Sequence, residues 1–267
     1  MKVRIVSAII ALLLTIPILV NGGLAFKLGV YFLALLSLRE LMNVRKVKSE
    51  IPDFIRFISY MILTIMIFSN IEQSELIFFL DFRVLAALSL ALLMPVVFYH
   101  DDKKYGVEDA FFMIGSLFFL SLAYTVLIVL RNISLPLVVY VLLLTTITDT
   151  YAYITGVLIG KTKLLETISP KKTVEGLLGG LIFGTLFAAV YFKTVVDPEI
   201  AYSTIIYITM FLSILGEIGD LVFSSIKRKY NKKDFGNIMP GHGGVLDRFD
   251  SIIFVLLGFL MFISVIG

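Results

Sequence analysis

The amino-acid sequence predicts an all-α polytopic integral membrane protein with about nine transmembrane helices, and three observations lead to this prediction. The chain of 267 residues is 59% hydrophobic and only 16% charged, whereas soluble domains are roughly 45–50% apolar and 25% charged. The apolar residues gather in long runs, and a helix needs about 20 such residues to cross a bilayer. Lys and Arg gather in alternate connections between these runs, as the positive-inside rule requires.

The expected spans follow the apolar runs in chain order. They cover roughly residues 3–20, 23–42, 54–70, 84–99, 109–130, 134–157, 174–192, 203–223 and 250–266. The first run follows Lys2 and Arg4 and also resembles a secretory signal peptide. Because Pro17 and Asn21 stand where a small-residue cleavage site would be needed, we expect a retained first helix.

The basic residues predict the orientation. With nine spans and a cytoplasmic N-terminus, only four of the 23 Lys and Arg residues lie outside, namely Lys27, Arg83, Arg131 and Lys193. The C-terminus is then expected outside. No composition break marks a second domain, so we expect one helical membrane domain over 1–267, with N-terminal spans in about 1–130 and a catalytic half in about 134–267. Its long cytoplasmic loops, 158–173 and 224–249, are where function is expected.

The chain contains no Cys. This excludes disulfides, thiolate nucleophiles and Cys-ligated metal centres. It also lacks Trp, so Tyr and Phe must supply any aromatic belt at the membrane interface.

Asp149 lies inside the sixth expected span. A carboxylate there costs roughly 2.5–3.5 kcal/mol on insertion scales, so it marks a functional site by default. A polar stripe that should face protein or water accompanies it, formed by Thr145, Thr146, Thr148, Thr150 and Tyr153. The alternative is a structural hydrogen bond between helices.

Two pairs of acids recur at a spacing of three. Glu217 and Asp220 end the eighth span, where this spacing puts both carboxylates on one helix face. We expect a cation between them, although a Lys or Arg from another helix would also neutralise the pair. Asp247 and Asp250 begin the ninth span, where acids also stabilise a helix N-terminus, an alternative that applies most to Asp250.

A glycine-rich segment, Pro240 to Gly244, leads into the ninth span. Gly241, Gly243 and Gly244 permit conformations closed to other residues and expose N–H groups ahead of a helix, which favours anion binding. His242 stands at its centre as a phosphate donor. Basic residues flank the segment on both sides, namely Lys227, Arg228, Lys232, Lys233 and Arg248.

A second basic segment precedes the seventh span. Lys171 and Lys172 lie where an anionic substrate would meet both lysines and a helix N-terminus, and Ser169 and Thr173 are candidate helix caps. Lysines that follow the positive-inside rule are the alternative. Together, acids, anion-binding loops and bases indicate phosphoryl or nucleotidyl transfer with Mg²⁺, a hard cation that carboxylates bind.

The segment from Ser224 to Asp250 resembles the phosphatidate cytidylyltransferase family. It meets every fixed position of the pattern S-x-hydrophobic-K-R-x4-K-D-x-G-x3-P-G-H-G-G-x-x-D-R-hydrophobic-D. The stretches 149–153 and 168–176 are also similar to the family, so the resemblance covers the chain from about Asp149 onward.

The resemblance implies the reaction of CTP with phosphatidic acid to give CDP-diacylglycerol and pyrophosphate, with a divalent metal. It makes Asp220 and Asp247 the leading metal ligands, with Asp149, Glu217 and Asp250 as further candidates. The expected catalytic residues are Asp149, Lys171, Lys172, Asp220, His242 and Asp247. The expected phosphate-binding residues are Ser169, Lys171, Lys172, Thr173, Ser224, Lys227, Arg228, Lys233, Gly241, His242, Gly243, Gly244 and Arg248.

The expected partners are CTP, phosphatidic acid and membrane lipids, with no nucleic acid, and we expect a bacterial inner-membrane protein whose site faces the cytoplasm. The family is commonly homodimeric, and the pairs Gly156/Gly160 and Gly180/Gly184 permit close helix packing, which we expect within one chain. Two alternatives stay open: a CTP-dependent polyprenol or phytol kinase, and a cation transporter that uses Asp149, Glu217 and Asp220. The transporter leaves the glycine-rich segment unexplained.

Overall fold

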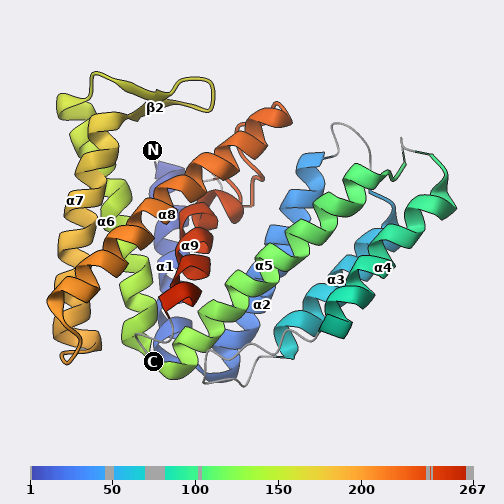
Figure 1. Cartoon of the computed structure of the whole chain (residues 1–267), viewed down its shortest axis with the longest axis horizontal. Helices are drawn as coiled ribbons and strands as arrows, with labels where there is room; N and C mark the ends of the chain where they lie inside the picture. Colours follow the sequence, from blue (N-terminus) through green and yellow to red (C-terminus); the bar gives the residue numbers. More distant parts are fainter. Residues whose placement is uncertain are drawn as a thin grey trace. The chain divides into compact units, whose positions relative to one another are not determined.

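The computed structural model describes residues 2–45, 51–69, 82–101, 104–238, 241 and 243–262. Within these ranges the chain is almost entirely helical, with one small antiparallel sheet (Figure 1). The elements in chain order are α1 (Lys2–Asn21), α2 (Gly23–Arg45), α3 (Asp53–Phe68), α4 (Phe82–Tyr99), α5 (Val107–Ile133), α6 (Leu135–Ile159), β1 (Lys163–Leu165), β2 (Ser169–Thr173), α7 (Val174–Tyr191), the π-helix η1 (Phe192–Val196), α8 (Tyr202–Lys229), α9 (Leu246–Phe259) and the 3-10 turn η2 (Leu260–Phe262).

Each of the nine predicted spans overlaps one of these α-helices. Among the described residues, four helices are long and apolar enough to cross a membrane, namely Val107–Ile133, Leu135–Ile159, Val174–Val196 and Tyr202–Lys229. The chain is therefore consistent with an integral membrane protein, as the composition predicts. The count of nine spans and their orientation stay predictions.

The chain falls into two compact units. Unit 1 comprises residues 1–132 and 234–247, and unit 2 comprises residues 133–233 and 248–267. The prediction of one membrane domain over 1–267 is not tested by this division.

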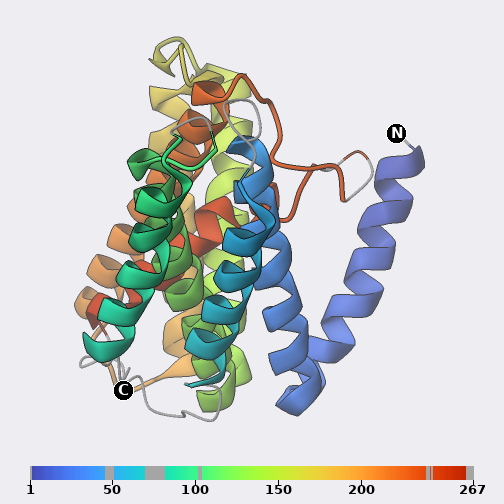
Figure 2. The ribbon, with the colours of Figure 1, turned by 90° about the vertical axis from the view of Figure 1, so that its right-hand side faces the viewer.

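In unit 1, α1 and α2 are joined by a tight turn and form the helix pair seen in blue in Figure 2. Gly22 makes this turn with φ of 65°, a value that few residues other than glycine adopt. Arg131 of α5 donates hydrogen bonds to the carbonyls of Leu19 (2.7 Å) and Val20 (2.8 Å). A Cβ at Gly22 would lie 2.6 Å from the Arg131 guanidinium, so only glycine leaves room for this cap on the end of α1.

Polar side chains also join α2 to α5 inside unit 1. Ser37 and Tyr124 share a buried hydrogen bond of 2.6 Å. Arg45 forms a buried ion pair with Asp109, and its guanidinium lies over the ring of Phe112. A buried polar group without a partner is costly, so these pairs fix the register of the two helices.

In unit 2, α6 and α7 pack at very close range on glycine. A Cβ at Gly180 would lie 2.7 Å from the carbonyl oxygen of Thr148 and 2.9 Å from the Cβ of Ala152. A Cβ at Gly156 would meet Thr173 at 3.1 Å. The expectation that these small residues pack helices within one chain is therefore confirmed for Gly156 and Gly180, and for Gly184, where an added Cβ would collide with Thr148 of α6. Gly160 is the C-cap of α6 and lies against Thr173.

Helices α8 and α9 complete unit 2. Tyr140 of α6 hydrogen-bonds Thr209 of α8 (2.9 Å), and its ring contacts Phe259 of α9. At Gly219 of α8, an added Cβ would lie 2.8 Å from both the carbonyl oxygen of Asp250 and the Cβ of Phe254. Glycine thus allows α9 to approach α8 closely.

The loop expected at 158–173 folds into a hairpin of β1 and β2, with Lys163 opposite Thr173 and Leu165 opposite Ser169. The carboxylate of Glu175, in the first turn of α7, accepts hydrogen bonds from the N–H groups of Lys161 (3.1 Å) and Thr162 (3.1 Å). The backbone of this polar segment is thereby paired with itself and with α7.

Candidate active site

The centre of the candidate site in unit 2 is the ammonium group of Lys172, at the end of β2. It contacts Glu217 Oε2 at 2.6 Å and Asp220 Oδ2 at 2.7 Å. The spacing of three on α8 therefore brings both carboxylates to one partner, as predicted. Lys172 neutralises the pair Glu217 and Asp220. A Lys or Arg partner was the alternative to a bound cation that the sequence left open.

Burial sets the electrostatics of this contact. The Glu217 side chain is 2% exposed and that of Lys172 is 21% exposed. Burial by itself would lower the pKa of Lys172, but the carboxylates of Glu217 and Asp220 outweigh it and raise that pKa above its usual range. Lys172 is therefore a permanent cation at physiological pH.

Asp250 of α9 adds a third carboxyl group, because it faces Asp220 across the close approach at Gly219. Its own Oδ1 accepts a hydrogen bond from the N–H of Ser251 (2.9 Å). Sequence reasoning missed Gly219, although the small residues Gly216 and Gly219 beside the acids were a signal for a helix crossing there.

Asp149 is exposed on α6, in electrostatic contact with Lys172, Glu217 and Asp220. Its polar stripe divides in two. Thr148 is buried and hydrogen-bonds Ser213 of α8 (2.9 Å), whereas Tyr153 is 73% exposed. Only part of the stripe therefore faces protein, and Asp149 itself lies on the open side.

Three predicted phosphate-binding residues lie on α8, and two of them border these acids. Ser224 donates a hydrogen bond to Asp220 Oδ1 (3.3 Å), which confirms that they share a helix face. Lys227 is 7% exposed and interacts electrostatically with Asp220 and Asp250. Arg228 is exposed and donates hydrogen bonds to the carbonyls of Ile168 and Lys232, both at 3.2 Å. We call Asp149, Lys172, Glu217, Asp220, Ser224, Lys227 and Asp250 the lysine–carboxylate cluster.

The remaining basic candidates of unit 2 are exposed. They are Lys171 in the hairpin, and Lys233 and Arg248 elsewhere in the unit. Thr173 is the N-cap of α7 and accepts a hydrogen bond from the N–H of Gly176 (3.1 Å), as predicted. Ser169 is not a helix cap, because it lies in β2 opposite Leu165.

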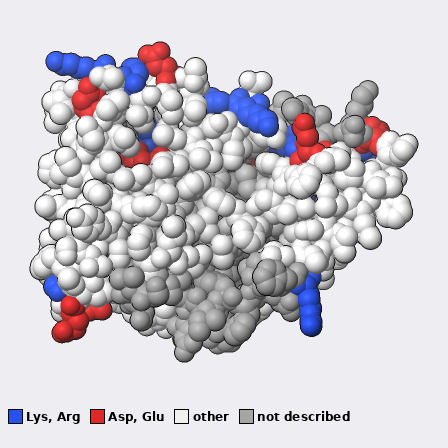
Figure 3. All heavy atoms as spheres, in the orientation of Figure 1, with Lys and Arg blue, Asp and Glu red and all other residues white. Residues whose placement is uncertain are grey.

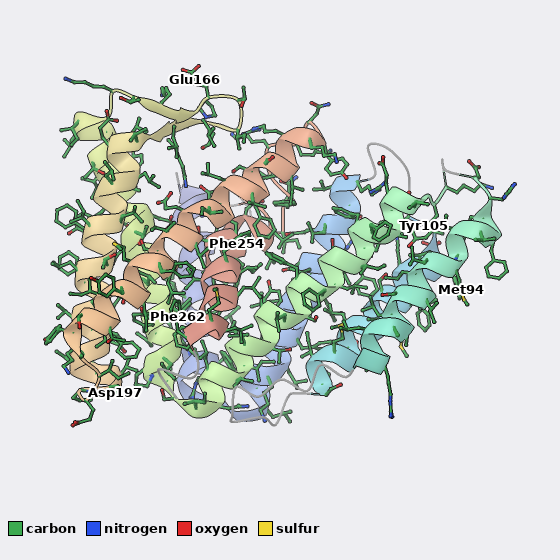
Figure 4. The ribbon with its side chains drawn as sticks, viewed as in Figure 1. Met94, Tyr105, Glu166, Asp197, Phe254 and Phe262 are labelled. Carbon is green, nitrogen blue, oxygen red and sulfur yellow. The ribbon has the colours of Figure 1, made fainter. Side chains whose placement is uncertain are left out.

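Exposed charged groups of the hairpin and of the segment after η1 lie at the two ends of α7. Figure 4 shows Glu166 of the hairpin turn and Asp197 at opposite ends of α7. Between these two ends, the face of unit 2 in Figure 3 is mostly uncharged. This arrangement suits helices that cross a bilayer with their polar chemistry near one surface.

The glycine loop, which we define as residues 241–244, belongs to unit 1. Gly241 and Gly243 have φ of 80° and 88°, values that confirm the predicted need for glycine. His242 and Pro240 lie outside the described residues, so the role expected for His242 stays a prediction.

The N–H groups at the end of the glycine loop were expected to be free to bind an anion, but they already donate hydrogen bonds within the chain. The N–H of Gly244 donates to Asp247 Oδ2 (2.9 Å), which also accepts from the N–H of Phe235 (2.8 Å). The N–H groups of Val245 and Leu246 donate to Glu40 of α2, both at 2.9 Å. The chain's own carboxylates thus occupy these three amides, and any phosphate must use other groups.

The same contacts exchange the roles expected for two acids. The ninth span was expected from about residue 250, with both acids at its start, and α9 begins at Leu246, so Asp247, rather than Asp250, satisfies N–H groups there. The residue that sequence reasoning missed entirely is Glu40. The second span shows only one acid among apolar residues, and an acid inside a span was the available signal.

The donor chemistry of the lysine–carboxylate cluster fits a divalent cation. Asp220 and Asp250 face one another, and adjacent carboxylates are stabilised by a cation between them. Within the described residues, the buried Glu217 Oε1 has no hydrogen-bond partner. In the part of the chain that the structure describes, however, no three acids or histidines converge as a complete ligand set.

Fold and site together define a helical protein with membrane-length apolar helices, in which a lysine holds two carboxylates of α8. The sequence model of the Cytidylyltransferase family matches residues 2–266. The chain belongs to this family.

Curated bacterial relatives agree with this assignment. The chain is 40% identical to "Phosphatidate cytidylyltransferase" of Staphylococcus saprophyticus over 257 residues, which cover 96% of each chain. It is 38% identical to the protein of that name from Staphylococcus haemolyticus, again over 96% of each chain. The one from Staphylococcus aureus strain COL is 36% identical over 259 residues and the same share of each chain. Our chain is thus similar to nucleotidyltransferase enzymes over nearly its whole length.

Proposed function

We propose that this chain transfers the cytidylyl group of CTP to phosphatidic acid, giving CDP-diacylglycerol and pyrophosphate. The observation that carries the proposal is the match to relatives of that name over 96% of both chains. The lysine–carboxylate cluster supplies matching chemistry, because it combines a permanent cation with several oxygen ligands in one place.

In the proposed reaction, a phosphate oxygen of phosphatidic acid attacks the α-phosphorus of CTP. A new P–O bond forms there, the bond from the α-phosphorus to the bridging oxygen breaks, and that oxygen leaves with pyrophosphate. No covalent enzyme intermediate is needed. Lys172 and Lys227 offer positive charge for the phosphates, and catalysis rests on positioning and charge neutralisation.

We propose Mg²⁺ as the cofactor, held by Asp220 and Asp250, with Glu217 and Asp149 as further candidate ligands. Asp247, the other ligand that the resemblance implies, belongs to unit 1, where it accepts hydrogen bonds from loop amides. When bound, Mg²⁺ supplies neutralisation of phosphate charge. Lys172 holds Glu217 and Asp220 in place and compensates their charge.

The position of the cluster suits a lipid substrate. It lies where the apolar helices α7 and α8 meet the polar hairpin, so a phosphatidate head group reaches it while the acyl chains stay in the bilayer. We propose that this end faces the cytoplasm of a bacterial inner membrane. A homodimer, which the family resemblance implies, must use surfaces other than Gly156 and Gly180, because those residues pack α6 against α7.

The proposal is tested with purified protein in detergent supplied with CTP, phosphatidic acid and Mg²⁺. We expect pyrophosphate and CDP-lipid to appear together and EDTA to stop both. Release of CDP with a phosphorylated polyprenol acceptor would instead indicate a kinase. Metal-dependent ion flux in liposomes without CTP turnover would indicate a transporter.

Two variants test the proposed ligands. Asp220→Asn and Asp250→Asn should each reduce turnover by at least about 100-fold while the protein stays folded, since metal sites are sensitive even to changes outside the first ligands. Lys229→Gln is the matched control, because Lys229 is exposed on the same helix and outside the cluster. Near-normal turnover in either Asn variant would remove that residue from the metal site.

A further inference from the structure

Glu40 lies in α2, in the half of the chain whose role the motifs leave unexplained. It is 2% exposed, yet it carries a carboxylate. One oxygen accepts the N–H of Val245 and the other accepts the N–H of Leu246, both at 2.9 Å. A carboxylate with two hydrogen bonds from a helix start is a strong, directional contact.

Two glycines make room for this carboxylate. A Cβ at Gly236 would lie 2.6 Å from Glu40 Oε1, and a Cβ at Gly244 would overlap the same carboxylate. Neither glycine has a positive φ, so their backbone conformations are open to other residues. What requires glycine at these two positions is the Glu40 side chain.

Glu40 acts beside a second carboxylate that holds the same segment. Asp247 Oδ2 accepts from the N–H groups of Phe235 and Gly244. The two acids therefore fix both ends of the stretch that contains the glycine loop, at residue 235 and at residues 244–246. Between those ends, Gly241 and Gly243 have left-handed conformations, which glycine adopts without strain.

We infer that Glu40 is a positioning residue for the proposed cytidylyl transfer: it holds the start of α9 at the end of the glycine loop, the segment that the sequence predicts to bind the CTP phosphates. It does not touch substrate. A helix start is normally capped by a neighbouring residue, whereas this one is capped from a helix 205 residues earlier in the chain. The N-terminal half thus takes part in the reaction through α2.

The test compares Glu40→Ala and Glu40→Gln with the wild-type protein in the turnover assay. Loss of both charge-assisted hydrogen bonds should raise KM for CTP roughly tenfold or more in Glu40→Ala. Glu40→Gln keeps one acceptor and should show a smaller rise. KM for phosphatidic acid should stay within about twofold, because the loop acts on the nucleotide.

A matched control separates positioning from general destabilisation. Tyr124→Phe removes the buried hydrogen bond to Ser37 of α2 in the same unit but leaves the loop contacts intact. It should lower the unfolding temperature and leave KM for CTP unchanged. If Tyr124→Phe raises KM for CTP as much as Glu40→Ala does, the inference is wrong.

Hydrogen–deuterium exchange gives a readout that does not depend on activity. In Glu40→Gln and Glu40→Ala, the amides of Val245 and Leu246 should exchange at least about tenfold faster, while Tyr124→Phe leaves them protected. Gly236→Ala should raise KM for CTP in the wild-type protein, because the new Cβ meets the Glu40 carboxylate. In the Glu40→Ala background that carboxylate is gone, so Gly236→Ala should cause no further rise.

The outcomes distinguish this inference from the function on which it rests. If the wild-type protein makes no CDP-lipid, the proposed function fails, whatever the exchange rates. If the wild-type protein is active and the Glu40 variants match its KM for CTP, the positioning role fails alone. Faster exchange with an unchanged KM would also overturn it, because Glu40 would then be only structural.

Discussion

Lys172 is the residue on which most of the unit 2 site depends. Its ammonium stands between Glu217, which is buried, and Asp220, which is half-buried. Removing one partner of a buried ion pair leaves an uncompensated charge, which costs more than the pair contributed. Lys172 therefore has two separable roles, one in holding the carboxylates and one toward the substrate phosphates.

A double-mutant comparison separates these roles. Lys172→Gln should destabilise the protein by about 3 kcal/mol, the lower end of the range for buried pairs, because part of the lysine is exposed. Adding Glu217→Gln should restore most of this stability by removing the stranded charge. Turnover should stay low in both variants, since the phosphates then lose the positive charge of Lys172. Thermal unfolding in detergent and the turnover assay measure the two effects.

The pH dependence of the same pair checks the assignment. The pKa of Lys172 is raised above its ordinary value of 10.5 in the folded chain. Its contribution to stability is therefore complete below pH 10.5 and is lost only as the pH rises through the raised pKa. Loss of the Lys172 contribution should therefore appear only above about pH 10, in the wild type and not in Lys172→Gln, when thermal unfolding of the two proteins is compared. Equal pH dependence of the two proteins in that alkaline range would contradict a lysine held by two carboxylates.

Helix packing on glycine is the main feature at the scale of elements. Gly180→Leu should destabilise unit 2 by about 1–3 kcal/mol, because the new side chain meets α6 backbone and Ala152. Gly115→Ala in α5 is the control, since a Cβ there has nothing within 4 Å, and it should be neutral or slightly stabilising. Unfolding temperatures compare the two variants, and equal effects would contradict close packing at Gly180.

Helix positions followed from the sequence because each apolar run is long and continuous, and all nine predicted ranges overlap a helix. The ends were harder to predict. The segment 158–173 looked like a polar loop, but Glu175 pairs with its first N–H groups and supports a hairpin. α9 begins at Leu246, ahead of the predicted span, because Glu40 and Asp247 accept hydrogen bonds from the backbone N–H groups at this point. Such long-range partners leave no local pattern.

At the scale of the whole molecule, the sequence predicted the chemistry better than the contacts. The acids at 217 and 220 were recognised from their spacing, and Lys172 from its place before a helix. That these three residues meet depends on how the hairpin approaches α8, which composition and periodicity do not determine. Glu40 was missed for the same reason, because its partners lie more than 200 residues away.

The span count itself is open to a direct test, because the chain has no Cys and single cysteines can be introduced without background. Four exposed positions report on four connections: Asp53, Arg83, Glu166 and Glu199. With nine spans and a cytoplasmic N-terminus, a membrane-impermeant maleimide should label Arg83→Cys and Glu199→Cys from outside. Asp53→Cys and Glu166→Cys should be labelled only after the membrane is opened.

The N-terminal pair of sites decides between nine spans and fewer. Helices α7 and α8 are long enough to cross, so 166 and 199 should lie on opposite sides in either case and serve as the internal control. α3 has only 16 residues, which is about 24 Å of helix against a hydrocarbon core of about 30 Å. If α3 crosses nonetheless, 53 and 83 are labelled from opposite sides. Labelling of both from the same side would mean that α3 does not cross, and the nine-span topology would be wrong.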